Sequence, residues 1–251
     1  MNEDQIMAIL YEIHEGLPRG GPGSTECTQR AFRMLAELPP KPAILDIGCG
    51  PGMHTLDLAA LTNGTIVALD NHQPFLDQLM AEARQHGLQN NIETAKEDMF
   101  SLDFAPETFD LIWSEAAIYI VGFEKGLLDW KPLLKPHGYM AISEIAWLRP
   151  DPPRDLRDFW AESYPGIQTI DENLATIRRC GYREIGHFVL DESTWWENLY
   201  TPIMERLPIL KEKYQGHPEA LTMLQIEEQE IDLYRRYSEY YGYVFFAMQA
   251  D

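Results

Sequence analysis

The sequence predicts an α/β fold, in which helices cover both faces of a mostly parallel β-sheet. Three observations predict it. Short apolar runs rich in β-branched residues alternate with amphipathic stretches from about residue 43, a glycine-rich turn follows the first run, and an aspartate stands at or near the end of each of the first two runs. Such alternation is typical of a parallel sheet buried between helices. A chain of 251 residues can form one domain with a full core.

The individual elements follow from hydrophobic periodicity and from the residues that interrupt it. Strands are expected at 43–47, 65–70, within 91–98, at 109–115, 139–145, within 183–190 and at 241–248, and helices at 53–61, 74–87, near 171–181 and at 218–240. The proline-rich stretch 147–155 predicts a loop. We expect an N-terminal helical cap segment over 1–42 and a core over 43–251, with a helical insertion over about 192–240 before the last strand.

The excess of acidic residues limits the kinds of molecule that the protein can bind. Acidic residues outnumber basic ones, 40 to 20, for a formal net charge of −20, which repels nucleic-acid phosphates and anionic lipids. The N-terminus carries acids where a secretory signal carries bases, and no apolar run reaches the ~18 residues of a membrane span, so a cytoplasmic location is expected. Cys27, Cys49 and Cys180 lack the spacing of a metal site or a disulfide framework, which predicts reduced thiols and no metal.

The stretch ILDIGCGPGMHT, residues 44–55, places Gly48, Gly50 and Gly52 directly after the first strand. Glycine permits positive φ and a close approach of the backbone to a ligand, and a glycine turn before a helix indicates a nucleotide-like one. The G-x-G-x-G spacing differs from that of dinucleotide sites. A carboxylate at Asp46 would repel a pyrophosphate but attract the ammonium and sulfonium groups of S-adenosylmethionine. The loop therefore favours the second ligand.

Acidic residues also follow the next two strands. Asp70 ends the second strand and, with Asn71 beside it in the predicted cofactor site, is placed to accept hydrogen bonds from both hydroxyls of a ribose. Asp98 follows the third strand, where it is placed to accept from an adenine amine while Met99 lies against the ring. Each acid alone could instead cap a helix or lie in solvent. The glycine loop, the acid for the ribose and the acid for the adenine follow three successive strands, and this order is the specific indication of an adenosine-containing cofactor.

These segments look like the motifs of class I S-adenosylmethionine-dependent methyltransferases: LDIGCGPG, ALD, KEDM, FDLIWSEAAIY and LLKPHGYMAISE. Within that superfamily the chain is most similar to the ubiquinone/menaquinone-biosynthesis-like (UbiE-like) branch of putative small-molecule methyltransferases. The resemblance implies a Rossmann-like seven-stranded sheet of order 3-2-1-4-5-7-6 with strand seven antiparallel. It also implies S-adenosylmethionine as cofactor, methyl transfer to a small-molecule acceptor, and a contact of Ser114 with the methionine part of the cofactor.

Candidate groups for the acceptor follow strands four and five. Glu115 and Tyr119 come after the fourth strand and Glu144 lies at the end of the fifth, at the sheet edge where such folds bind ligands. Two acids beside aromatic rings suit a cationic acceptor, or one of them serves as a general base; Glu115 has helix capping as a further alternative. In similar enzymes an N-terminal helix closes over the cofactor, which adds His14 as a candidate catalytic residue.

Two other functions stay open at this point. A nicotinamide-dependent oxidoreductase would share the fold, although Asp46 and the glycine spacing argue against it, and a non-catalytic cofactor-binding partner protein would keep the same motifs. The aromatic clusters at 195–200 and 234–246 are expected to pack the inserted helices on the sheet, with a substrate lid or a homodimer face as the alternative. O-, N- and C-methylation are equally compatible with the motifs.

Overall fold

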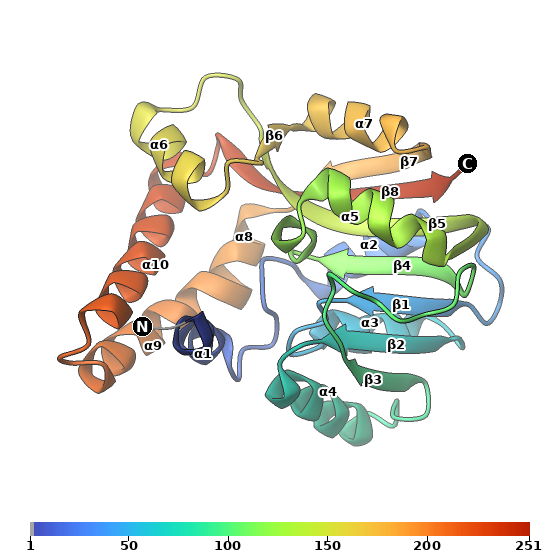
Figure 1. Cartoon of the computed structure of the whole chain (residues 1–251), viewed down its shortest axis with the longest axis horizontal. Helices are drawn as coiled ribbons and strands as arrows, with labels where there is room; N and C mark the ends of the chain where they lie inside the picture. The colour runs from blue at the N-terminus through green and yellow to red at the C-terminus, as the bar shows by residue number, and fades with distance from the viewer. Residues whose placement is uncertain (1–2) are drawn as a thin grey trace.

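A mostly parallel sheet forms the centre of the computed structural model, which describes residues 3–251 (Figure 1). Its path is β3-β2-β1-β4-β5-β8-β7, with β8 antiparallel to both neighbours, so the predicted topology is confirmed with β7 and β8 as strands six and seven. A two-residue strand, β6, pairs with β5 and was not predicted. The strands are β1 (Ala43–Ile47), β2 (Thr65–Asp70), β3 (Ile92–Lys96), β4 (Phe109–Glu115), β5 (Leu134–Trp147), β6 (Gln168–Thr169), β7 (Tyr182–Val189) and β8 (Tyr241–Ala250).

The fifth strand departs most from the predicted bounds. The sequence predicted this strand at 139–145, but β5 begins at Leu134 and includes His137, which has a positive φ of 61°. The pairing of β4 with β5 shifts register between Phe109 and Leu111. The extra residues of β5 are therefore absorbed as an irregularity in the ladder.

Helices cover both faces of the sheet. In Figure 1, α5 and α7 lie on the face toward the viewer, and α2 and α3 lie on the other. Side chains of β1 alternate between the two resulting cores, with Ile44 in one and Leu45 in the other. The helices are α1 (Glu3–His14), α2 (Thr25–Arg33), α3 (Met53–Leu61), α4 (Gln73–Gln85), α5 (Phe123–Trp130), α6 (Arg154–Ser163), α7 (Ile170–Arg179), α8 (Glu192–Trp195), α9 (Thr201–Lys213) and α10 (Pro218–Tyr237), with short turns of other helix types at Ile118–Ile120, Lys131–Leu133 and Trp196–Tyr200.

A second group of helices lies beyond the carboxyl ends of the parallel strands, on the left of Figure 1. We call α1, α6, α8, α9 and α10 the helical lobe. Arg206 of α9 donates hydrogen bonds to the carbonyls of Glu12 and Ile13 at the end of α1, at 3.1 and 3.0 Å. The ring of Trp195 stacks on Tyr234 at a centroid distance of 4.2 Å and lies 6.0 and 5.4 Å from the rings of Tyr241 and Tyr243 of β8. The aromatic clusters therefore pack the inserted helices on one another and on the sheet, as predicted. The N-terminal helix and the inserted helices thus form one packed unit.

Two further features bear on the sequence predictions. The loop that the prolines predicted is short, because α6 begins directly after Pro153. Every cysteine is buried and forms no disulfide in the part of the chain that the structure describes. Among residues 3–251, no helix combines the length and the apolar character needed to cross a lipid bilayer.

Candidate functional site

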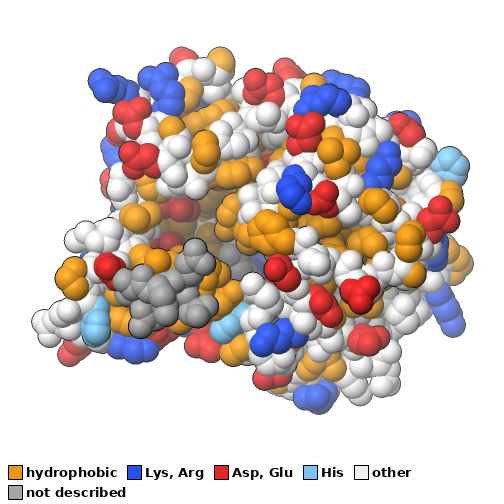
Figure 2. All heavy atoms as spheres, in the orientation of Figure 1, with side chains coloured by type: hydrophobic (Ala, Val, Ile, Leu, Met, Phe, Trp, Pro, Cys, Tyr) orange, Lys and Arg blue, Asp and Glu red, His pale blue; other side chains and the backbone are white. Residues whose placement is uncertain are grey.

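A cavity of about 250 Å³, here called the first cavity, lies beyond the carboxyl ends of β1, β2 and β4. The molecule is visibly hollowed between the sheet and the helical lobe, with hydrophobic side chains along the hollow (Figure 2). Open parallel sheets bind their ligands at this edge. The predicted site residues that line the first cavity are His14, Gly48, Gly50, Asp70, Asn71, Asp98, Met99, Glu115 and Tyr119.

The three glycines of the loop have different surroundings. Gly48, Gly50 and Gly52 adopt φ values of 73°, 52° and 91°, which favour glycine. A Cβ at Gly48 would lie 2.6 Å from the Cβ of Ala117, and one at Gly52 would lie 2.5 Å from Leu79. A Cβ at Gly50 would meet nothing nearer than 3.8 Å. The loop therefore leaves room above Gly50, whereas Gly52 packs against protein and does not line the cavity.

Asp70 lies at the end of β2 with both oxygens engaged by the backbone. Its Oδ2 accepts a hydrogen bond from the N–H of Gly50 at 2.9 Å, and its Oδ1 accepts from the N–H of His72 at 2.8 Å. Burial raises the pKa of Asp70, against the lowering effect of these two donors. The adjacent Asn71 accepts from the hydroxyl of Tyr11 at 2.7 Å. The predicted ribose acid is therefore held in one orientation, and Asn71 joins α1 to the end of β2.

The loop after β3 carries the residues predicted for an adenine ring. Asp98 accepts a hydrogen bond from the N–H of Phe100 at 3.0 Å, and the carbonyl of Met99 accepts from the indole of Trp130 at 3.2 Å. The Met99 side chain lies 3.2 Å from the position that a Cβ at Gly48 would occupy. The structure thus brings this loop beside the glycine loop, with both predicted side chains on the cavity wall.

Asp46, which the sequence places to attract a cofactor directly or through a water, does not line the first cavity, and its cofactor contact stays a prediction. Its side chain is fully buried and accepts a hydrogen bond from the hydroxyl of Thr55 at 2.6 Å. The Nε2 of His54 lies 3.2 Å from its other oxygen, and His54 lines the cavity. Burial acts to lower the pKa of His54, but the charges of Asp46 and Glu115 outweigh it and raise that pKa. His54 is therefore the side chain through which Asp46 is linked to the cavity wall.

Ser114 also lies behind the cavity wall. It is fully buried on β4, and its hydroxyl donates to the carbonyl of Ile47 on β1 at 2.9 Å. The hydroxyl of Ser143, on β5, accepts a hydrogen bond from the N–H of Ala116 at 2.8 Å. These serines join the ends of β1, β4 and β5 where the first cavity begins. The contact of Ser114 with a cofactor stays a prediction.

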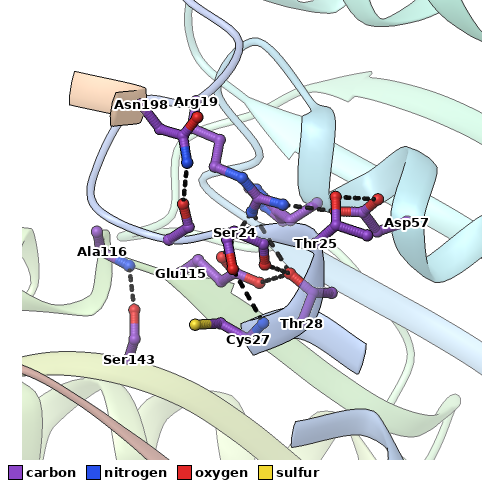
Figure 3. A network of polar contacts seen from close by, with 12 residues as sticks. Arg19, Ser24, Thr25, Cys27, Thr28, Asp57, Glu115, Ala116, Ser143 and Asn198 are labelled. Carbon is purple, nitrogen blue, oxygen red and sulfur yellow. Dashed lines mark hydrogen bonds and ion pairs between the residues drawn. The ribbon is translucent and has the colours of Figure 1, made fainter. Parts of the chain in front are cut away.

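Glu115 lies in a polar network that the sequence did not reveal (Figure 3). The guanidinium of Arg19, whose side chain is 3% exposed, donates to Glu115 Oε2 at 3.0 Å and pairs with Asp57 of α3. The hydroxyl of Thr28 and the indole of Trp113 donate to Oε1 at 2.8 and 3.0 Å. Donors of the protein itself thus engage both oxygens of Glu115. The geometry therefore favours a positioning role for Glu115 over the general-base role.

Arg19 belongs to a tightly packed segment over the end of β4. A Cβ at Gly21 would lie 2.5 Å from the Cβ of Ala116, and the carbonyl of Gly23 accepts a hydrogen bond from Asn198 at 2.7 Å. Residues 19–23 thus connect the sheet to the helical lobe. The sequence contains one indication that Arg19 is important: it is a single basic residue within a stretch of glycine and proline, in a chain that is acidic overall.

A second cavity, of about 300 Å³, adjoins the first. The walls of both cavities include His14, Tyr119 and Ala116. In the described part of the chain, no lysine or arginine lines the second cavity. Its other walls come largely from the helical lobe and β8, and their polar and aromatic members are Trp160, Ser163, Tyr164, Trp195, Glu227, Glu230 and Tyr243.

Glu144 lies just behind the wall of the second cavity. Its side chain is buried and hydrogen-bonded to Tyr164, and its Oε2 has no partner among the described residues. Burial raises the pKa of Glu144 to about 8, against the lowering effect of Tyr164. Trp147, near Glu144 in the sequence, packs against Tyr241 at a centroid distance of 6.4 Å. Glu144 therefore reaches the cavity through Tyr164 and not by its own carboxylate.

His14 lines both cavities, at their junction. Its Nδ1 lies 2.9 Å from the carbonyl of Leu10, and because a carbonyl only accepts, Nδ1 is the donor. In the neutral ring the lone pair is then on Nε2. Burial lowers the pKa of His14, against the opposite effects of Leu10 and the charge of Glu230. A neutral imidazole with a free Nε2 has the form that a proton acceptor needs.

Part of the chain is similar in sequence to known methyltransferases. A family model described as "Methyltransferase domain" matches residues 44–138. Sterol 24-C-methyltransferase erg-4 of Neurospora crassa is 28% identical over 155 residues, which cover 57% of this chain and 40% of that protein. The corresponding match to the enzyme of Clavispora lusitaniae, at 29% identity, covers 43% of this chain and 28% of the relative. The chain thus spans less than half the length of these curated relatives.

Solved structures match over nearly the whole chain. A methyltransferase of Geobacter sulfurreducens, dependent on S-adenosylmethionine and in complex with S-adenosyl-L-homocysteine, has a TM-score of 0.78 at 22% identity, covering 98% of both chains. The [4+2]-cyclase SpnF has a TM-score of 0.77 at 16% identity, covering 98% of this chain and 93% of that one. These matches confirm the predicted Rossmann-like fold. Because a cyclase shares it, the fold does not decide the reaction.

Proposed function

We propose that this chain transfers a methyl group from S-adenosylmethionine to a small-molecule acceptor. The observation that carries the proposal is the pair of adjoining cavities at the carboxyl edge of the sheet, which share His14 and Tyr119. Two reactants can meet there from separate sites. The match of residues 44–138 to a methyltransferase domain supports this, because these residues form most of the sheet side of the first cavity.

The groups on the wall of the first cavity fit the parts of this cofactor. The free space above Gly50 admits a ligand close to the backbone of the loop. Asp70 would accept hydrogen bonds from the ribose, and Asp98 and Met99 would hold the adenine. The raised pKa of His54 favours a cationic ring on the same wall, which suits the carboxylate of the methionine part.

The chain's own contribution to the reaction would be alignment and proton removal. When bound, the cofactor supplies a methyl group on a positively charged sulfur, which keeps the electron pair of the broken bond. Tyr119, on the wall of both cavities, would position the acceptor for in-line attack on that methyl carbon. His14 Nε2 would take the proton of an acceptor O–H or N–H. Glu115 and Arg19 would keep residues 19–23 in place over the junction.

Calorimetry with S-adenosylhomocysteine, S-adenosylmethionine and NAD tests the cofactor. We expect binding of the first two and none of NAD, with affinity at least about tenfold lower in Asp70→Asn because hydrogen bonds to a charged acceptor are lost. Asp77→Asn is the matched control, since Asp77 lies on α4 and contacts Gln73 at the surface. Tight NAD binding without any response to S-adenosylhomocysteine would establish the oxidoreductase alternative.

Turnover is measured as release of S-adenosylhomocysteine with a panel of small amines, phenols and alkenes. Cofactor binding without turnover of any acceptor, together with a stable complex with another protein, would favour the non-catalytic alternative. The UbiE-like branch, the cytoplasmic location, the boundaries at residues 42 and 192–240 and a homodimer stay predictions from the sequence.

A further inference from the structure

Two carboxylates of α10 line the second cavity, to whose wall the described chain contributes no lysine or arginine. Glu227 and Glu230 are three residues apart, so they share one face of the helix. Glu230 accepts a hydrogen bond from the hydroxyl of Tyr200 at 2.8 Å. Neither carboxylate forms an ion pair with a lysine or arginine in the part of the chain that the structure describes. The pair therefore presents uncompensated negative charge to an enclosed space.

The contrast with the first cavity is informative. There, Arg19 compensates Glu115 and His54 accompanies Asp46. Burial raises the pKa of both Glu227 and Glu230, and the charge of Glu227 raises that of Glu230 further. Two partly buried acids that pair with no lysine or arginine of the described chain are unfavourable for the protein alone. A cation brought by a ligand would relieve that cost.

Two tryptophans give the second cavity aromatic walls beside the two acids. Trp160 and Trp195 line the same cavity, and their side chains are 6% and 1% exposed. The indole N–H of each lacks a hydrogen-bond partner among the described residues. Buried indole donors are normally satisfied, so two unsatisfied ones in one wall are unusual. Indole faces also stabilise cations when water is excluded.

We propose that the second cavity is the acceptor site and that it selects an amine-bearing acceptor with an apolar body. The ammonium group would pair with Glu227 and Glu230, and the apolar body would contact the rings of Trp160 and Trp195. This assignment rests on the proposed methyl transfer. The atom to be methylated would lie at the junction beside His14 and Tyr119, so the ammonium serves recognition. Anionic acceptors are excluded by the same two carboxylates.

Three matched probes test the charge preference: 4-phenylbutylamine, 4-phenylbutanol and 5-phenylpentanoate. They share the phenyl ring and the four-carbon chain and differ in the charge at its end. Binding is measured by calorimetry, with and without S-adenosylhomocysteine. We expect the amine to bind at least about tenfold more tightly than the alcohol, and the carboxylate more weakly than the alcohol. Equal affinity of the wild-type protein for the amine and the alcohol would overturn the proposal.

Variants of α10 assign the preference to the two acids. The double variant Glu227→Gln, Glu230→Gln should lose the preference for the amine while it keeps its affinity for the alcohol, which shows an intact cavity. Glu228→Gln is the control, because Glu228 is on the same helix but pairs with Lys211 at the surface. Retention of the amine preference in the double variant, or equal loss of amine and alcohol binding, contradicts the proposal.

The same titrations separate this inference from the proposed function. If S-adenosylhomocysteine binds and the amine shows no preference, only the acceptor assignment fails. If S-adenosylhomocysteine does not bind, the methyltransferase proposal fails whatever the amine does.

Discussion

The two cavities differ in the way the chain builds them. The first takes its polar groups mainly from short loops that directly follow β1, β2, β3 and β4, and its buried Glu115 is paired with Arg19. The second combines α1, the end of α6, α10 and β8, and the acids on its wall have no cationic partner in the described chain. Under the proposed function, the sheet loops would bind the methyl donor and the added helices would choose the acceptor.

The junction of the cavities gives the largest expected effect. His14→Gln should lower turnover about a hundredfold or more, for an acceptor whose nucleophile carries a proton, because the free Nε2 is lost. The affinity for S-adenosylhomocysteine should change little. The wild-type rate should fall at low pH as His14 becomes protonated, and this dependence should be absent from the variant. His86→Gln, exposed at the end of α4, is the control. Normal turnover of His14→Gln would mean that the cavities do not meet at a catalytic base.

The ion pairs of Arg19 beside the first cavity should give the next largest effect, a loss of stability. Arg19→Met leaves Glu115 and Asp57 without their cation, and removal of one member of a buried pair costs about 3–5 kcal/mol. The free energy of unfolding in urea measures this loss. Arg33→Met, at an exposed arginine that contacts Gln29, should cost less than about 1 kcal/mol. A loss in Arg19→Met as small as that of the control would show that the network contributes little.

Glu144 behind the second cavity should make stability depend on pH. Its pKa in the folded protein, about 8, lies above the ordinary value of 4.5, so the folded state holds a proton that the unfolded chain releases. The wild-type protein should therefore lose stability as the pH rises from about 4.5 through about 8. Glu144→Gln should be as stable as wild type at pH 5 and more stable at pH 9, by about 2–4 kcal/mol. Parallel pH curves for the two proteins would contradict this.

The glycine loop gives the smallest effect. Gly48 and Gly87 both have a φ of 73°, so alanine at either position carries the same backbone strain. A Cβ at Gly87 meets nothing within 4 Å, whereas one at Gly48 would lie 2.6 Å from Ala117. Gly48→Ala should therefore cost about 1–3 kcal/mol more than Gly87→Ala in urea unfolding. Equal losses would show that the loop relaxes without strain.

The sequence predictions were accurate for the sheet and its loops and less accurate where a side chain depends on another segment. The bounds of β1, β2 and β4 and of α3 agree with the predicted ranges, because each is a short run whose periodicity and flanking residues are local. The sequence also identified Asp70 as the acid that ends the second strand and Asp98 as the acid that follows the third. Asp46 was predicted to face the ligand, but its orientation depends on His54 and Thr55 of the next helix. A one-dimensional pattern does not indicate which side of a strand end is open.

Other residues gave no comparable signal. Arg19 was an isolated base in a loop, and its role appears only because Glu115 and Asp57, which are far away in the sequence, fold around it. The pair Glu227 and Glu230 occurs in a run of helical acids that resembles a solvated face. Their burial is decided by the packing of α10 over the sheet edge.

By itself, the sequence determined the alternation of strands and helices, the glycine loop and the acids that follow the first strands, because each depends on residues within one turn or one strand of each other. The tertiary structure decided which charges are compensated, which carboxylates line a cavity, and that two cavities meet beside His14. These properties depend on burial and on contacts between distant segments, and neither is encoded in local spacing.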